Sequence, residues 1–97
     1  MGAIRDRGTL RLALQDVAAG RARAGDRLFE AIGLQVYAVA TVVTGRRELA
    51  EPVVAEAFRE IADTAVSLCG DPDAALRILS LTQRIARDRA PRRPLLV

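Results

Sequence analysis

Few side chains in this sequence could carry out acid–base or nucleophilic chemistry. The chain has no His and one Cys, and no basic residue stands near Cys69 to activate its thiol as a nucleophile. Asp71 and Asp73 flank Pro72, a pattern that the start of a helix explains better than metal ligation does. A glycine-rich phosphate loop is also missing. We therefore expect a protein that is not an enzyme and that holds no metal and no other cofactor.

The charged residues indicate two surfaces of opposite sign instead. Residues 46–63 carry five acidic and three basic side chains, a net charge of −2. Residues 84–97 carry five Arg and one Asp, a net charge of +4. All 15 basic residues of the chain are Arg, so part of this content reflects the base composition of a GC-rich genome. The distribution nevertheless favours two different partners for the middle and the end of the chain.

The basic end is the candidate nucleic-acid contact. Its members are Arg84, Arg87, Arg89, Arg92 and Arg93. Arg84 and Arg87 are three residues apart, so they share a helical face and could follow a phosphate backbone. Five such contacts would make log K fall with log salt by about 0.9 per contact. The alternative is that these Arg residues merely complement the dipole at a helix C-terminus.

Apolar periodicity predicts an all-α fold, a compact bundle of four helices. We expect them over residues 9–22, 26–43, about 50 to 68, and 72–89. Thr44 and Gly45 should end the second helix, with Gly45 in the left-handed conformation. Pro52 lacks an N–H, so the third helix should begin near Ala50, which places the proline in the first turn. Asp71 should cap the fourth helix, with Pro72 at its first position.

The same periodicity predicts which side chains point inward. On the third helix and its continuation the predicted buried residues are Val54, Phe58, Ile61, Ala62, Ala65 and Val66, and the predicted exposed ones are Glu51, Glu56, Glu60 and Asp63. Gly33 interrupts the second helix at a cost of about 1 kcal/mol against Ala. We expect this glycine to permit a close crossing with another helix.

The chain has the length of one domain. We assign residues 1–8 to an N-terminal extension, 9–90 to the helical domain and 91–97 to a Pro- and Arg-containing tail. No uninterrupted apolar run approaches about 18 residues, and the N-terminus lacks the apolar segment of a secretory signal. We therefore expect a cytoplasmic protein that does not enter the membrane.

Four segments, in order, match a known pattern of bacterial transcription proteins. They are Gly25-Asp26 with Phe29, Val36-Tyr37-Ala38 with Ala40 and Val43-Thr44-Gly45, Ala50-Glu51 with Val53-Val54, Glu56 and Phe58, and Arg84-Ile85-Ala86-Arg87. By their order and spacing the chain resembles region 2 of the extracytoplasmic-function sigma factors, and the resemblance covers about residues 10–89. It departs from that pattern where Pro52 and Ala55 replace an Asp and a Gln, and where Leu81 and Asp88 replace a Trp and an Asn.

The resemblance implies a partner for each charged surface. In the family the acidic helix binds the coiled coil of the RNA polymerase clamp, and the end of region 2 lies against promoter DNA. On this chain the polymerase-binding residues would be Glu51, Val54, Glu56 and Phe58. Pro52 and Ala55 replace an Asp and a Gln on this helix, which removes two polar contacts worth about 0.5–1.5 kcal/mol each. Their loss is enough to weaken polymerase binding by roughly one to two orders of magnitude.

Opening of promoter DNA is not expected. A flipped base needs aromatic side chains to stack on, and the periodicity assigns Phe29, Tyr37 and Phe58 to the core or its margin. The leading hypothesis is a divergent region-2-like protein, and half of a split sigma factor is one form of it. The alternative is a protein–protein interaction module that keeps the sigma fold but has lost polymerase binding. Such a module would form a homodimer that buries the third helix, or would sequester a regulator.

Overall fold

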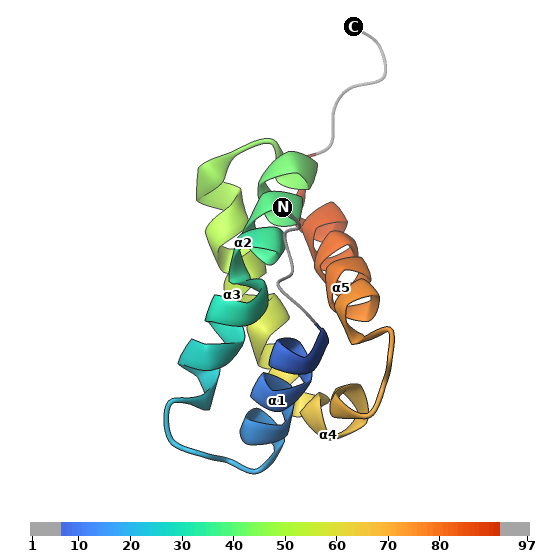
Figure 1. Ribbon diagram of the computed structural model, residues 1–97. Coiled ribbons are helices and arrows are strands. Elements are labelled where there is room, and N and C mark those ends of the chain that lie inside the picture. The colour runs from blue at the N-terminus through green and yellow to red at the C-terminus, as the bar shows by residue number, and fades with distance from the viewer. Residues whose placement is uncertain (1–6, 92–97) are drawn as a thin grey trace, which may run out of the picture.

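A computed structural model of the chain describes residues 7–91, and this part is all-α with no strand. Its helices are α1 (Arg7–Ala18), α2 (Ala24–Thr44), α3 (Arg47–Asp63), α4 (Ala65–Cys69) and α5 (Ala74–Arg89) (Figure 1). The predicted fold class is therefore confirmed. The four predicted helices correspond to α1, α2, α3 and α5, and the single turn of α4 is an addition that the sequence pattern merged with the third helix.

Helix α2 is the central element of the bundle. It packs against α1, α3 and α5, and Figure 1 shows α3 and α5 running along it on either side. Its side chains Leu28, Ile32 and Val36 are almost completely buried. In length and apolar composition α2 would also pass for a membrane-spanning helix. Its packing against three neighbouring helices is the arrangement expected of a core helix.

The end of α2 follows the prediction. Gly45 has a φ of 78°, and its N–H donates a hydrogen bond of 2.8 Å to the carbonyl oxygen of Thr41. Thr44 is buried, and its hydroxyl donates a hydrogen bond of 2.7 Å to the carbonyl oxygen of Ala40. The left-handed residue turns the chain back. As a result α3 begins two residues later and returns along α2.

The predicted start of α3 near Ala50 is wrong. The helix begins at Arg47, so Pro52 lies beyond the first turn, inside the helix. Pro52 cannot donate the hydrogen bond that the carbonyl oxygen of Glu48 would accept in a regular helix. Both residues are exposed, so water can reach that carbonyl. Solvation explains how the helix tolerates a proline at this position.

The inward face of α3 is also shifted from the predicted one. The buried residues of α3 are Ala50, Val53, Ala57 and Ile61. Val54 and Phe58 lie half-buried at the edge, and Ala62 is exposed. Val66 belongs to α4 and is 74% exposed, because the chain leaves the α3 direction at Thr64. Small alanines allow close helix contact, whereas the sequence pattern had given weight to the larger side chains beside them.

The connection into α5 is held by Asp71. Its Oδ1 accepts a hydrogen bond of 2.8 Å from the N–H of Asp73, and its Oδ2 pairs with the guanidinium of Arg77. Helix α5 begins at Ala74 with Asp73 as the flanking residue, so the predicted start at Pro72 is wrong by one half-turn. The N–H of Asp73 is the main cause that lowers the pKa of Asp71, and Arg77 lowers it further.

Replacement of Pro52 by Ala should stabilise the protein. Pro52→Ala restores one helical hydrogen bond and removes a clash with the preceding turn, at the expense of a more flexible unfolded chain. We expect the free energy of unfolding to rise by about 1–3 kcal/mol, measured by urea denaturation. The control is Pro72→Ala in the connection before α5, which should change stability by less than about 1 kcal/mol. An equal effect of both substitutions would contradict the placement of Pro52 inside α3.

Acid should destabilise the protein partly through Asp71. Since the pKa of Asp71 is lowered from its ordinary 3.8, its stabilising contribution is present above that value and is lost as the pH falls through the lower, folded-state pKa. Unfolding measured between about pH 5 and pH 2 should therefore be less pH-dependent in Asp71→Asn than in the parent chain. Arg77→Gln should keep part of the pH dependence, because the hydrogen bond from the N–H of Asp73, the largest single cause, remains. Loss of the whole effect in Arg77→Gln would reverse that order.

Candidate functional site

The four predicted polymerase-binding residues lie on two sides of α3. Glu51, Val54 and Phe58 are spaced by three and four residues, so they share one side of the helix. Glu51 is exposed, and Val54 and Phe58 are half-buried. Glu56 lies on the opposite flank and faces α5, where its Oε1 accepts hydrogen bonds from Arg89. The structure therefore brings three of the four residues together and separates Glu56 from them.

Val54 and Phe58 line an open groove between α3 and the start of α2. The apolar residues of this groove are Val17, Leu28, Phe29, Val54, Phe58 and Ala62. The rings of Phe29 and Phe58 lie with centroids 5.5 Å apart at an interplanar angle of 42°. Arg21 and Asp26 also line the groove. It thus combines an apolar floor with charged side chains, which suits a helical partner of mixed polarity.

Gly33 has a different role from the predicted helix crossing. A Cβ atom at Gly33 would lie 2.8 Å from Cγ of Phe29, one turn earlier on the same helix. The missing side chain thus leaves space for the Phe29 ring, which contacts Phe58 of α3. The crossing prediction is wrong because the neighbour is a side chain of α2 itself. The sequence spacing of four residues between Phe29 and Gly33 was the available signal.

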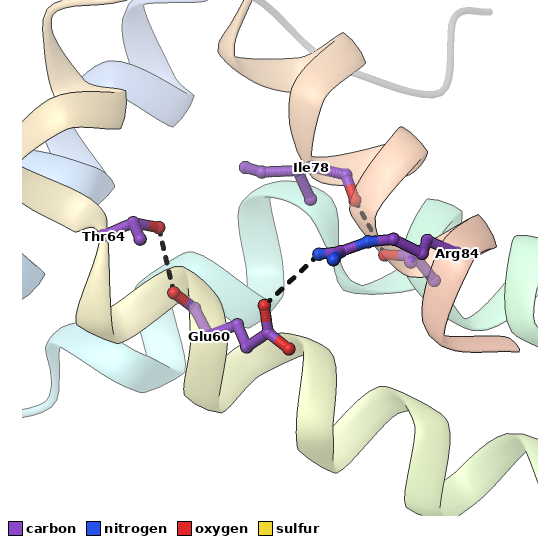
Figure 2. A network of polar contacts seen from close by, with 5 residues as sticks. Glu60, Thr64, Ile78 and Arg84 are labelled. Atoms are coloured by element: carbon purple, nitrogen blue, oxygen red, sulfur yellow. Dashed lines mark hydrogen bonds and ion pairs between the residues drawn. The ribbon is translucent and has the colours of Figure 1, made fainter. Parts of the chain in front are cut away.

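Two of the predicted DNA-contacting arginines pair with carboxylates of α3. Arg89 reaches Oε1 of Glu56 with its Nε at 3.0 Å and its Nη2 at 2.8 Å. Arg84 Nη2 lies 3.5 Å from Oε1 of Glu60, and Figure 2 shows this side chain extending from α5 toward α3. The acidic and basic segments therefore meet along the α3–α5 contact. The two partners in each pair are 33 and 24 residues apart in sequence, so periodicity could not predict them.

Local hydrogen bonds fix the backbone on both sides of this contact. The hydroxyl of Thr64 donates a hydrogen bond of 2.9 Å to the carbonyl oxygen of Glu60, where α3 ends (Figure 2). On α5 the buried hydroxyl of Thr82 donates 2.8 Å to the carbonyl oxygen of Ile78. Both hydroxyls are thus satisfied within their own helical segments. The charged tips of Glu60 and Arg84 carry the link between the helices.

The predicted DNA-contacting arginines differ in their exposure and in their ion pairs. Arg87 is exposed and forms no ion pair within residues 7–91. Arg84 keeps 65% of its side-chain surface exposed in its pair with Glu60. Because exposed ion pairs contribute little, Arg84 could exchange its carboxylate for a phosphate. Arg92 and Arg93 lie outside the described residues.

The residues considered for chemistry have structural partners. The Sγ of Cys69 donates to the carbonyl oxygen of Val66 at 3.2 Å, and Asp71 is engaged by Asp73 and Arg77. Across residues 7–91, no group of three or more His, Cys, Asp or Glu side chains is placed to hold a metal ion. Cys69 and Asp71 are thus engaged in local contacts of the connection before α5.

Comparison of the chain with protein-family models, with curated proteins and with solved structures finds no match. The resemblance to sigma region 2 therefore stays a prediction from the sequence. A proposed function can rest on three observations in the described residues. They are the groove beside Phe58, the exposed Glu51 and the exposed Arg87, which forms no ion pair there.

Substitution of Gly33 should separate the two phenylalanines. In Gly33→Ala the new Cβ forces the Phe29 ring away from Phe58, which should lower the free energy of unfolding by about 1–2 kcal/mol despite the better helix propensity of Ala. In a Phe29→Ala background Gly33→Ala meets no ring, so it should raise the free energy of unfolding by about 1 kcal/mol. Urea unfolding of the four chains measures both effects. Stabilisation of equal size in both backgrounds would contradict the contact.

Proposed function

We propose that this protein is a region-2-like transcription protein of the cytoplasm that docks on the clamp helices of RNA polymerase. The contact surface is the side of α3 that carries Glu51, Val54 and Phe58, and the Arg-containing end of α5 lies near promoter DNA. The observation that supports this most is that Val54 and Phe58 stay half-exposed at an open groove beside an exposed carboxylate. A coiled-coil partner presents apolar side chains with basic neighbours, which fits this surface.

The surface is smaller than the resemblance alone implies. Glu56 already accepts two hydrogen bonds from Arg89, so a partner would have to compete for it. Pro52 and Ala55 are exposed on the outer side of α3 near Glu51, and neither side chain can donate or accept a hydrogen bond. Affinity then rests on one carboxylate and two apolar anchors. We therefore infer a dissociation constant in the micromolar range or weaker, about −8 kcal/mol or less favourable.

The basic end supports contact with DNA but not its opening. Arg87 and Arg84 are exposed on α5 and can reach phosphates. Phe29 and Phe58 contact each other, and Tyr37 is half-buried on α2. Phe29 is 48% exposed, so the prediction that it belongs to the core or its margin is wrong for this residue, but its ring lies against Phe58 and not clear of the surface as a stacking platform would. In this proposal promoter opening therefore depends on other components of the transcription complex.

The alternative is an interaction module that has lost polymerase binding. One observation favours it, which is that large apolar side chains are exposed well away from α3. Leu34 and Val42 on α2 are 82% and 80% exposed. Exposed apolar patches of this kind indicate protein–protein contacts. The alternative module could use these residues or bury α3 in a homodimer, so a substitution on α3 is read out both as polymerase binding and as self-association.

The test is binding of the full chain to core RNA polymerase and to its isolated clamp helices at low salt. Glu51→Arg reverses the charge at an exposed position and should weaken binding at least tenfold, which corresponds to about 1.4 kcal/mol. The matched control is Asp63→Arg, an exposed charge reversal near the other end of α3, which should change binding less than twofold.

Two outcomes would contradict the proposal. One is the absence of any complex at about 100 µM of the parent chain, because a dissociation constant weaker than that would not support a specific docking surface. The other is an equal effect of Glu51→Arg and Asp63→Arg, which would point to general electrostatics rather than a defined surface. If Glu51→Arg instead dissociates a homodimer of the free protein, α3 is the dimer surface and the alternative function is favoured.

A further inference from the structure

One side of α2 is apolar although it faces away from the core. No charged residue occurs between Glu30 and Arg46. Within this run Leu34, Ala38 and Val42 are each four residues apart, so they form a stripe along one side of the helix. Leu34 is 82% exposed, Val42 is 80% exposed and Ala38 is also exposed. The buried side chains Ile32, Val36 and Ala40 occupy the opposite side of α2.

The stripe continues into a shallow hollow between α1 and α2. The apolar residues of the hollow are Leu12, Ala13, Phe29, Ala31 and Leu34, and the charged residues Asp16, Arg27 and Glu30 also line it. Leu12 is itself 60% exposed. A helix that is apolar on all sides needs a partner for each side. In the described residues the core supplies one such partner, and the outer stripe has none.

We propose that this stripe binds a second copy of the same chain, with the two α2 helices antiparallel across a two-fold axis at Ala38. The pattern of residues around Ala38 is self-complementary. Leu34 and Val42 each lie four residues from it, and Glu30 and Arg46 each lie eight residues from it. A two-fold interface requires such symmetry, because residue i meets residue j and j meets i.

In this dimer Leu34 lies opposite Val42 of the partner subunit, next to the hollow lined by Leu12. Glu30 lies opposite Arg46 of the partner subunit. Glu30 lies eight residues from the axis, about 12 Å at 1.5 Å per residue, and Arg46 follows Gly45 just beyond the end of α2. The two ion pairs would therefore border the apolar contact at its ends. The small side chain of Ala38 at the axis allows the helices to approach to about 8–10 Å.

The charges favour a second copy over a membrane surface. Glu30 and Arg46 are exposed, and neither forms an ion pair within residues 7–91. Their signs are opposite, as a self-complementary pairing needs. A helix that lies on a membrane usually has basic residues along its polar face, whereas Glu30 borders this stripe. Phe29 contacts α3 and also lines the hollow, whereas Glu51 and Val54 lie on α3 and do not line it, so the dimer would leave them free.

Sedimentation velocity of the full chain from about 1 to 300 µM tests the dimer. We expect the mass to rise from 10.5 kDa toward twice that value as the concentration increases. Val42→Asp should abolish this rise. The matched control is Val66→Asp on α4, at the far end of the bundle, because Val66 has a similar exposure of 74%. Far-UV circular dichroism melts should show that both variants remain folded, since both positions are exposed.

Charge reversal tests the antiparallel register. Glu30→Arg and Arg46→Glu each place like charges opposite one another, so each alone should weaken dimerisation at least tenfold. An equimolar mixture of these two variants should form a heterodimer, because two pairs of opposite charge are then restored, one in the native polarity and one reversed. The double variant Glu30→Arg/Arg46→Glu should likewise recover the homodimer.

Several results would overturn the proposal. A monomer at 300 µM excludes it, as does equal disruption by Val42→Asp and Val66→Asp. Failure of the mixed variants to associate excludes the register around Ala38. Co-sedimentation with vesicles of anionic lipid that is lost in Val42→Asp, without self-association in solution, would assign the stripe to a membrane surface instead. The polymerase test uses substitutions on α3, so a failure to bind polymerase would not contradict the dimer. A failure to dimerise would likewise not contradict polymerase binding.

Discussion

The rest of the structure depends on the burial of α2. This helix is in contact with α1, α3 and α5, and no charged side chain occurs in it after Glu30. Burial of a side chain such as Leu28, Ile32 or Val36 contributes about 1.5–3 kcal/mol. The surrounding helices then need only short apolar faces of their own. Several of the side chains that α3 and α5 bury are alanines. The outer sides of these two helices are therefore free to carry polar and charged residues.

The sequence predicted those features that depend on local backbone chemistry. The all-α class and the end of α2 at Thr44-Gly45 follow from apolar periodicity and from the tolerance of glycine for a positive φ. The start of α3 was predicted wrongly, because the rule that proline belongs in the first turn of a helix describes an average helix. In this helix the carbonyl of Glu48 is open to water, so a proline is tolerated further in. The inward face of α3 was shifted for a related reason. Ala50 and Ala57 bury fully when helices pack closely, and hydrophobicity alone ranks them below Val54 and Phe58.

The candidate site was predictable to the extent that it lies on one helix. The spacing of Glu51, Val54 and Phe58 predicts a shared side, and the structure has it. Glu56 is two residues from Val54, so helical spacing alone sets it on another side of α3, whereas its pairing with Arg89, on a helix far along the chain, could not be predicted. The same long-range pairing changes the meaning of the basic end. Arg89 joins α5 to α3, and Arg87 is left as the side chain of α5 with the clearest freedom to contact phosphate.

The all-round apolar character of α2 constrains what the molecule can do. A core helix that served the fold alone would place charged side chains on its outer side, as α3 does with Glu51 and Asp63. Instead Leu34 and Val42 remain exposed, at an unfavourable hydration free energy that only a partner would recover. The groove beside Phe58 lies on a different side of α2, where Phe29 meets α3. One helix can therefore support the fold, a contact between copies and the wall of a groove for a third partner, because each uses a separate side of it.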